Sequence, residues 1–164
     1  MPARPRPADS QPDPRTIRAI ALALVARRDY TSAELESKLI DKGYEPGLVA
    51  GVIEDFVAQR ILDDRRTAAA HVRRAAAIKG RGRVRIGREL TSRGVSRDII
   101  DEVLSEVARD DELASLRKIL SRKRWPANPS RLERQRMYRH LLGRGFPTDL
   151  ISRALGSAGE DDAD

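Results

Sequence analysis

Apolar residues recur at intervals of three and four along most of the chain, which is the spacing that places side chains on one face of an α-helix. Ile17, Ala21 and Leu24 have this spacing near the start of the sequence, and Leu35 and Leu39 have it again further on. No stretch shows the sustained alternation of apolar and polar residues that is typical of a strand. The pattern therefore predicts an all-α protein.

The pattern repeats every 51 residues. Three segments align without a gap, and each carries a leucine followed four residues later by a glycine: Leu39 with Gly43, Leu90 with Gly94, and Leu141 with Gly145. The position four residues before each leucine is also apolar and is occupied by Leu35, Ile86 and Met137. A fixed interval of this kind is typical of proteins that stack copies of one supersecondary unit.

Each glycine predicts the end of one helix and the approach to another. Glycine accepts the left-handed conformation that closes a helix, and a preceding cation suits the negative end of the helix dipole. Those cations are Lys42, Arg93 and Arg144, and the residues that follow the glycines are the apolar Tyr44, Val95 and Phe146. Because proline is tolerated in a first helical turn and serine is a good N-cap, the next helices are expected to start near Pro46, Ser96 and Pro147.

A further helix is predicted before each of these pairs. In the first repeat it covers roughly 15–28. In the second repeat two acidic residues are expected to cap a helix with apolar positions at intervals of four: Asp63 and Asp64, then Ala68, Val72 and Ala76. The third follows the same plan, from Asp110 and Asp111 through Leu113, Leu116 and Leu120 to a stop at Trp125 and Pro126.

Each repeat therefore comprises three helices, and neighbouring repeats are expected to stack into a curved, elongated solenoid. The expected units are 15–61, 63–108 and 110–157. Residues 1–14, rich in proline, are expected to form a disordered arm, and the acidic residues 158–164 a frayed tail.

The composition excludes several classes of site. There is no cysteine, which rules out disulfides, thiolate metal sites and cysteine nucleophiles, and there are only two histidines, His71 and His140. The glycines at 82 and 87 are followed by Arg88 and Glu89 rather than by the Lys and Ser/Thr of a phosphate-binding loop. We therefore expect no metal, no cofactor and no enzymatic activity. No apolar run approaches the ~20 residues of a membrane span, so we expect a cytoplasmic protein. We also expect it to be a monomer.

Basic residues are concentrated in two regions of the chain, whose net charge is +7. Residues 65–97 contain eleven basic residues and one acidic residue, and residues 117–144 contain ten and one, whereas 15–61 contains seven of each. Clustered positive charge predicts a surface that faces a polyanion. The alternative is a solvated basic face whose excess of arginine reflects the codon usage of a GC-rich genome.

Helical geometry identifies which cations point outward. Because Ile86 and Leu90 mark the buried face of their helix, Arg85 and Arg88 are expected to point away from it, and the equivalent positions in the third repeat are again basic. The predicted basic stripe comprises Arg73, Arg74, Lys79, Arg81, Arg83, Arg85, Arg88, Arg122, Lys123, Arg124, Arg131, Arg136 and Arg139.

Several motifs resemble the RecX family of recombinase regulators. They are Ala21 to Arg28 with Ser32-Ala33-Glu34-Leu35, Ile61-Leu62-Asp63-Asp64, Lys79-Gly80-Arg81-Gly82 through Glu89-Leu90, and His140 to Phe146. The resemblance covers about residues 15–157. One departure is Thr67-Ala68-Ala69, where the family often has an aromatic residue.

The resemblance implies a protein that binds the RecA recombinase filament. It also implies contact with single- or double-stranded DNA, either directly or through that filament. It also implies inhibition of the ATPase, strand-exchange and co-protease activities of RecA. Whether the stripe meets DNA phosphates or acidic patches of the recombinase stays open. The alternative function is a nucleic-acid-binding protein, sequence-nonspecific or of the helix-turn-helix kind, that acts directly on DNA. A turn that recurs three times at one interval favours a repeat array over a single recognition helix.

Overall fold

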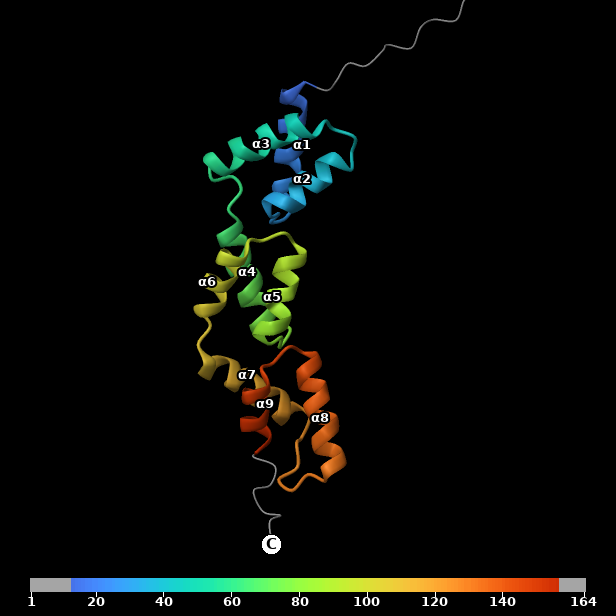
Figure 1. The fold of residues 1–164 in the computed structure, drawn as a ribbon, viewed down its shortest axis with the longest axis vertical. Helices are drawn as coiled ribbons and strands as arrows, with labels where there is room; N and C mark the ends of the chain where they lie inside the picture. The colour runs from blue at the N-terminus through green and yellow to red at the C-terminus, as the bar shows by residue number, and fades with distance from the viewer. Residues whose placement is uncertain (1–12, 157–164) are drawn as a thin grey trace, which may run out of the picture. The chain divides into compact units, whose positions relative to one another are not determined.

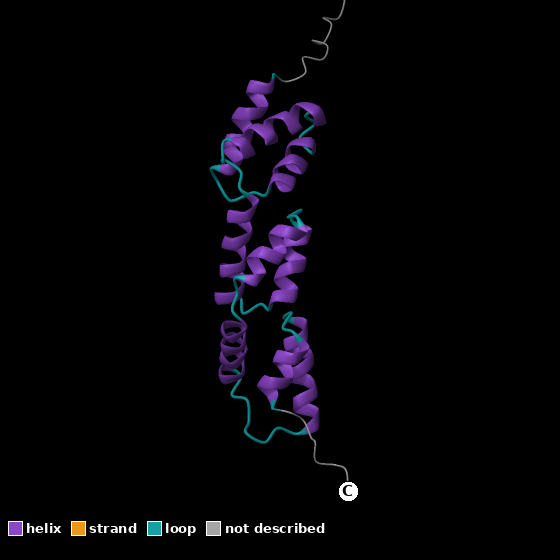
Figure 2. Cartoon of the chain, turned by 60° about the vertical axis from the view of Figure 1, so that its left-hand side comes forward, coloured by secondary structure: helices purple, strands orange, loops and turns teal. Residues whose placement is uncertain are grey.

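The computed structural model describes residues 13–156, and every regular element within that range is an α-helix. Figures 1 and 2 show helices joined by short loops, without strands in the described part of the chain. The helices are α1 (Pro14–Val25), α2 (Ser32–Ile40), α3 (Pro46–Ala58), α4 (Asp64–Ala77), α5 (Arg83–Ser92), α6 (Arg97–Ser105), α7 (Arg109–Arg122), α8 (Arg131–Gly143) and α9 (Thr148–Leu155). The expected frayed tail, and all of the expected arm except Asp13 and Pro14, lie outside the described residues.

Local side chains begin several of these helices. Asp13 accepts a hydrogen bond from the backbone N–H of Arg15, so α1 starts at Pro14. Thr31 and Glu34 form a reciprocal capping box at α2, with both hydrogen bonds 3.1 Å long. Such caps satisfy backbone N–H groups that have no partner inside the helix.

The acidic pair at the start of α4 divides its tasks. Asp63 caps the helix as predicted, because its carboxylate accepts from the backbone N–H of Arg66 at 2.8 Å. Asp64 does not cap α4; it accepts instead from the backbone N–H and the hydroxyl of Ser32, at 2.7 and 3.2 Å. Its carboxylate therefore stabilises the N-terminus of α2, a partner 32 residues away that local sequence does not indicate.

The three repeated glycines end helices as predicted. Gly43, Gly94 and Gly145 have φ angles of +90°, +73° and +85°, which an L-amino acid adopts only with strain. The backbone N–H that follows Gly145 donates to the carbonyl of Leu141, and Gly43 has the equivalent bond. The helix before Trp125 ends earlier than predicted, at Arg122, because Arg124 takes a left-handed conformation with φ +50°.

The first compact unit contains the described residues up to Thr67 together with Arg93–Val95. Its core is formed by α1, α2 and α3, and Figure 1 shows these three helices crossing one another. The buried residues include the predicted apolar positions Ile17, Ala21, Leu35 and Leu39. The same hydrophobic cluster also contains Val49, Val52, Ile53, Phe56 and Leu62.

The second compact unit contains Ala68–Ser92 and the described residues from Ser96 onward. In its third repeat the predicted Leu113, Leu116, Leu120 and Leu141 are buried, as are Phe146, Leu150, Ile151 and Leu155. Trp125 is half-buried against this cluster. In α4 the buried apolar positions are Ala68, Val72 and Ala75, so the third apolar position is one residue earlier than predicted and Ala76 is half-buried.

The arginine before the turn glycine contacts equivalent positions of the repeat twice, once in each unit. In the first unit, Arg93 accepts at its carbonyl from the Thr31 hydroxyl and donates from its guanidinium to the carbonyl of Asp29. In the second unit, the carbonyl of Arg144 accepts from the backbone N–H of Gly82, 51 residues after Thr31.

The guanidinium of Arg144 donates to the carbonyl of Gly80, 51 residues after Asp29. The sequence repeat is therefore also a repeat of the contact that joins one turn to the start of an earlier helix.

Gly82 lies where two backbone segments meet. It is buried, and a Cβ atom at this position would overlap the carbonyl group of Gly145. The lack of a side chain at Gly82 is required by this approach, which brings residues 82 and 145 together, rather than by the turn alone.

Candidate polyanion-binding surface

Two of the predicted stripe cations share one carboxylate. Glu89 lies 2.6 Å from the guanidinium of Arg81 and 3.1 Å from that of Arg85, and its other oxygen lies 3.0 Å from Nε2 of His71. Burial raises the pKa of Glu89, but the hydrogen bonds from Arg85, His71 and Arg81 outweigh it, so the pKa lies below its ordinary value. Arg81 and Arg85 are therefore compensated within the chain.

Arg83 has a structural partner as well. Glu112, which is buried in the first turn of α7, accepts from the Nε of Arg83 at 2.9 Å and from its backbone N–H at 2.8 Å. A second guanidinium nitrogen of Arg83 donates to the carbonyl of Val107 at 3.0 Å. These bonds attach the start of α5 to α7, and they leave Arg83 half-buried rather than presented to solvent.

The other ten predicted stripe residues are exposed. Within residues 13–156, none of them has a carboxylate within salt-bridge distance. They are Arg73, Arg74, Lys79 and Arg88 of the second repeat and Arg122, Lys123, Arg124, Arg131, Arg136 and Arg139 of the third. Exposed cations of this number that form no salt bridge attract polyanions through the release of condensed counterions.

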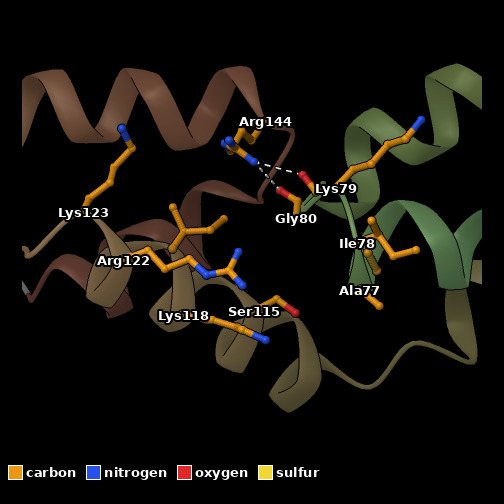
Figure 3. Close-up of a pocket in the computed structure, with 11 residues that line it drawn as sticks. Ala77, Ile78, Lys79, Gly80, Ser115, Lys118, Arg122, Lys123 and Arg144 are labelled. Atoms are coloured by element: carbon orange, nitrogen blue, oxygen red, sulfur yellow. Dashed lines mark hydrogen bonds between the residues drawn. The ribbon is translucent and has the colours of Figure 1, made fainter.

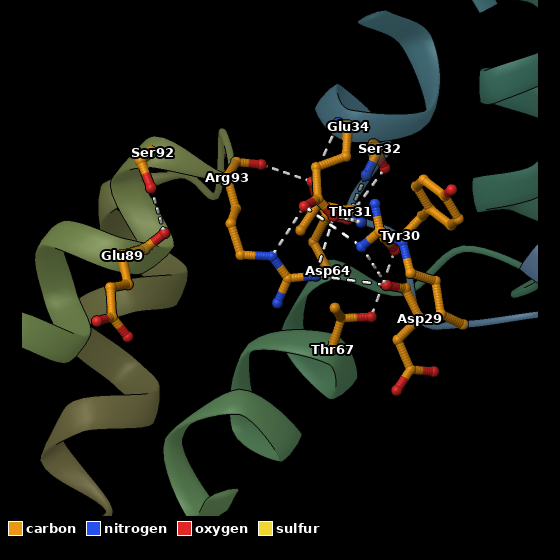
Figure 4. A network of polar contacts seen from close by, with 11 residues as sticks. Asp29, Tyr30, Thr31, Ser32, Glu34, Asp64, Thr67, Glu89, Ser92 and Arg93 are labelled. Atoms are coloured by element: carbon orange, nitrogen blue, oxygen red, sulfur yellow. Dashed lines mark hydrogen bonds and ion pairs between the residues drawn. The ribbon is translucent and has the colours of Figure 1, made fainter. Parts of the chain in front are cut away.

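In the first unit, one carboxylate neutralises two arginines. Figure 4 shows Glu34 facing Arg93, whose Nε and Nη2 donate to the two carboxylate oxygens at 3.1 and 2.9 Å. Arg28 lies 3.6 Å from the same carboxylate. Burial raises the pKa of Glu34, yet the hydrogen bonds from Arg93 and Thr31 and the two arginine charges bring it below its ordinary value.

Some of the exposed cations line an open pocket of about 370 Å³ in the second unit. The pocket lies between the end of α4 with its following loop, the C-terminal half of α7, and Arg144 (Figure 3). Of the eleven lining residues, five are cationic and none is acidic: Lys79, Lys118, Arg122, Lys123 and Arg144. The remaining lining residues are Ala76, Ala77, Ile78, Gly80, Ser115 and Ile119.

Arg144 holds one side of this pocket in place. Its guanidinium donates to the carbonyls of Lys79 and Gly80 at 3.0 and 3.2 Å, and its Nε donates to Nε2 of His140 at 3.2 Å. Burial lowers the pKa of His140, and the charges of Lys123 and Arg144 lower it further. Both effects favour the neutral imidazole, which accepts from Nε of Arg144.

The sequence identified three of the five pocket cations and missed Lys118 and Arg144. Lys118 lies one helical turn before Arg122, so helical spacing around Arg122 would have indicated it. Arg144 was interpreted as a helix-ending cation, but its equivalence with Arg93 at an interval of 51 residues was visible in the repeat. The hydrogen bonds that place Arg144 against Lys79 and Gly80 could not be predicted from the sequence.

Other kinds of site find no support in the described part of the chain. Residues 13–156 contain no group of three or more acidic or histidine side chains arranged to hold a metal ion. In the same range, no helix is both long enough and apolar enough to cross a membrane. The candidate polar residues of the sequence have partners within the chain: His71 contacts Glu89, and Asp63 and Asp64 accept from the backbone N–H groups of Arg66 and Ser32.

Comparison with known proteins gives a consistent family. Models of the first, second and third three-helix domains of RecX match residues 18–56, 63–104 and 110–155. The structure is also similar to the crystal structure of RecX from Lactobacillus salivarius, with a TM-score of 0.80 over 87% of this chain and 94% of that one. At 18% identity this similarity shows a shared fold, and it confirms the predicted all-α architecture of three-helix repeats.

Curated relatives are closer in sequence. The regulatory protein RecX of Halorhodospira halophila is 40% identical over 147 residues, which cover 89% of this chain and 90% of that protein. The regulatory protein RecX of Pseudomonas savastanoi is 35% identical over 150 residues, covering 91% and 96%. Since the family models span all three repeats and these relatives match over most of both lengths, the chain belongs to the RecX family of regulatory proteins.

Proposed function

We propose that this chain binds the filament of RecA recombinase on DNA and inhibits its ATPase, strand-exchange and co-protease activities. It would thereby modulate recombination and the DNA-damage response. Its relatives are named regulatory proteins, which is consistent with an interaction protein rather than an enzyme. The observation that carries the proposal is the set of ten exposed stripe cations without carboxylate partners in residues 13–156.

The charge distribution supports a polarised mode of binding. A recombinase filament on DNA is a dense polyanion, and each cation that replaces a condensed counterion makes association more favourable and more sensitive to salt. The exposed stripe cations belong to the second and third repeats, whereas the first repeat, 15–61, has as many acidic as basic residues. We therefore assign polyanion contact to the second and third repeats.

The direct test is the DNA-dependent ATPase of the cognate RecA protein. Rates are measured on single-stranded DNA while the chain is added from substoichiometric to stoichiometric amounts. The proposal expects the rate to fall as the chain is added. An unchanged rate at a stoichiometric amount would contradict it.

A pair of charge-reversal variants tests the surface. Arg88→Glu with Arg136→Glu reverses two exposed positions that have no salt-bridge partner in the described chain, and it is expected to weaken both binding and inhibition while helicity is unchanged. Arg85 is less suitable, because a glutamate there would face Glu89. The control is Arg27→Glu with Lys38→Glu, an equal charge change at exposed positions of the first repeat.

Affinity for free DNA separates this function from direct nucleic-acid binding. Binding of the chain to bare single- and double-stranded DNA is compared with binding to the filament at the same salt concentration. The filament regulator is expected to bind the filament more tightly. Equal affinities would favour a nucleic-acid-binding module that acts on DNA itself.

A further inference from the structure

We propose that the pocket formed by the end of α4, the C-terminal half of α7 and Arg144 binds consecutive phosphate groups of a nucleic-acid strand. This inference deepens the proposed function and rests on it for its biological setting. The pocket itself, its ligand chemistry and the inclusion of Lys118 and Arg144 follow from the geometry below.

The cations that line the pocket come from separate segments. Figure 3 shows Lys118 and Arg122 side by side on α7, with Arg144 opposite them on the chain that leaves α8. Lys79 and Lys123 stand at two opposite ends of the same pocket. Within the described chain no carboxylate lines this space, so an anion entering it meets cations without a competing charge.

The hydrogen-bonding character of the walls favours phosphate over an acidic peptide. The cationic side chains are donors only, and the carbonyls of Lys79 and Gly80 already accept from Arg144. A phosphodiester backbone carries acceptors only, so donors alone satisfy it. A peptide would also bring backbone N–H groups that need acceptors, and among the lining side chains the hydroxyl of Ser115 is the one acceptor.

The apolar part of the pocket suits the groups between phosphates. Ile78 is 76% exposed beside Lys79, and Ile119 and Ala77 line the same space. An isoleucine so exposed at the edge of a cationic pocket can cover the face of a sugar or base while the cations hold the flanking phosphates. Arg122 and Arg144 add guanidinium groups, whose planar donors match phosphate oxygens in pairs.

The first experiment measures the affinity of the full chain for inorganic tripolyphosphate by isothermal titration calorimetry at low salt. Lys118→Gln with Arg122→Gln removes two pocket charges, and Arg136→Gln with Arg139→Gln removes two exposed charges of the same unit that do not line the pocket. Loss of charge-assisted hydrogen bonds predicts affinity about tenfold weaker for the first pair and about twofold or less for the second. Equal losses for both pairs would replace the pocket with a diffuse basic surface and overturn the inference.

A histidine titration locates the bound anion independently. The chain has two histidines, so His140, next to Arg144, and His71, held by Glu89, give separate NMR resonances. An anion in the pocket is expected to raise the pKa of His140, because it offsets the charges that lower it, and to leave His71 as the reference. A His140 resonance whose titration is unaffected by saturating tripolyphosphate would contradict binding at this site.

The ligand source is decided by three further probes: an oligothymidylate of twelve nucleotides, ATP and polyglutamate. We expect the oligothymidylate to bind most tightly and to lose affinity in the Lys118→Gln, Arg122→Gln variant. Tighter binding of ATP would overturn the assignment to a strand, and equal binding of polyglutamate would overturn the assignment to phosphate. The two proposals can fail separately. Tight phosphate binding without inhibition of RecA would support the pocket and contradict the proposed function, whereas inhibition of RecA without phosphate binding would support the function and contradict the pocket.

Discussion

Glu112→Ala removes the carboxylate that joins α7 to the start of α5, and it tests whether Arg83 serves the fold rather than a ligand. Glu112 is 5% exposed and accepts two hydrogen bonds from Arg83, at 2.8 and 2.9 Å. A hydrogen bond to a charged group contributes ~1.5–3 kcal/mol, and breaking a buried ion pair by removing one partner costs ~3–5 kcal/mol. The side chain of Arg83 is 27% exposed, so water will take over part of its solvation. The expected loss in the free energy of unfolding is therefore about 2–4 kcal/mol.

The assay is thermal and urea denaturation followed by circular dichroism. For a chain of this size, the expected loss corresponds to a fall in Tm of about 5–15 °C. Asp110→Ala is the matched control, because Asp110 is exposed in the same first turn of α7 and contributes mainly to the helix dipole. It is expected to cost ~0.3–1 kcal/mol.

The double variant Arg83→Met with Glu112→Leu completes the test. Replacing both partners with apolar residues of similar size is expected to restore most of the stability, since neither charge is then left without its partner. Binding to the recombinase filament should be unaffected by the double change. If Glu112→Ala unfolds no more easily than Asp110→Ala, or if the double variant loses filament binding while remaining folded, the assignment of Arg83 to the fold is refuted.

Two further predictions concern the turns and the carboxylates. Gly43→Ala is expected to cost about 1–2 kcal/mol, because its φ is +90° in open space, whereas Gly145→Ala should cost about 1–3 kcal/mol more, since the new Cβ would overlap Arg85. Equal losses in urea denaturation would show that the close approach at Gly145 relaxes freely. The pKa values of Glu34 and Glu89 lie below the ordinary 4.5, so the unfolded chain binds more protons in acid, and the stability present above pH 4.5 is lost as the pH falls through the lowered values. Glu34→Gln with Glu89→Gln should flatten this acid-side loss in denaturation curves recorded across that range, and an unchanged slope would contradict the assignment of the two carboxylates.

Features that depend on neighbours within a few residues were predictable from the sequence. The apolar faces marked by Leu35 and Leu39, or by Leu113 and Leu116, arise from helical periodicity, and the left-handed turn at Gly94 arises from backbone sterics. The interval of 51 residues then extended one local interpretation to three repeats. These are short-range effects, so the order of residues contains most of the necessary information.

The partners of the charged residues were decided by tertiary structure. Arg81, Arg83 and Arg85 read as members of the basic stripe, yet they face Glu89 and Glu112 in the folded chain. Helical spacing shows which way a side chain points, but not which segment lies opposite it.

The pocket shows the same division between sequence and structure. Lys79 and Lys118 are separated by 39 residues, and Arg144 completes the site from the turn after α8. The sequence by itself determined the helices, the repeat and the excess of positive charge, because these follow from local geometry and composition. Only the tertiary structure decided which cations are neutralised and which remain available, because an ion pair depends on distances between segments that the fold alone brings together.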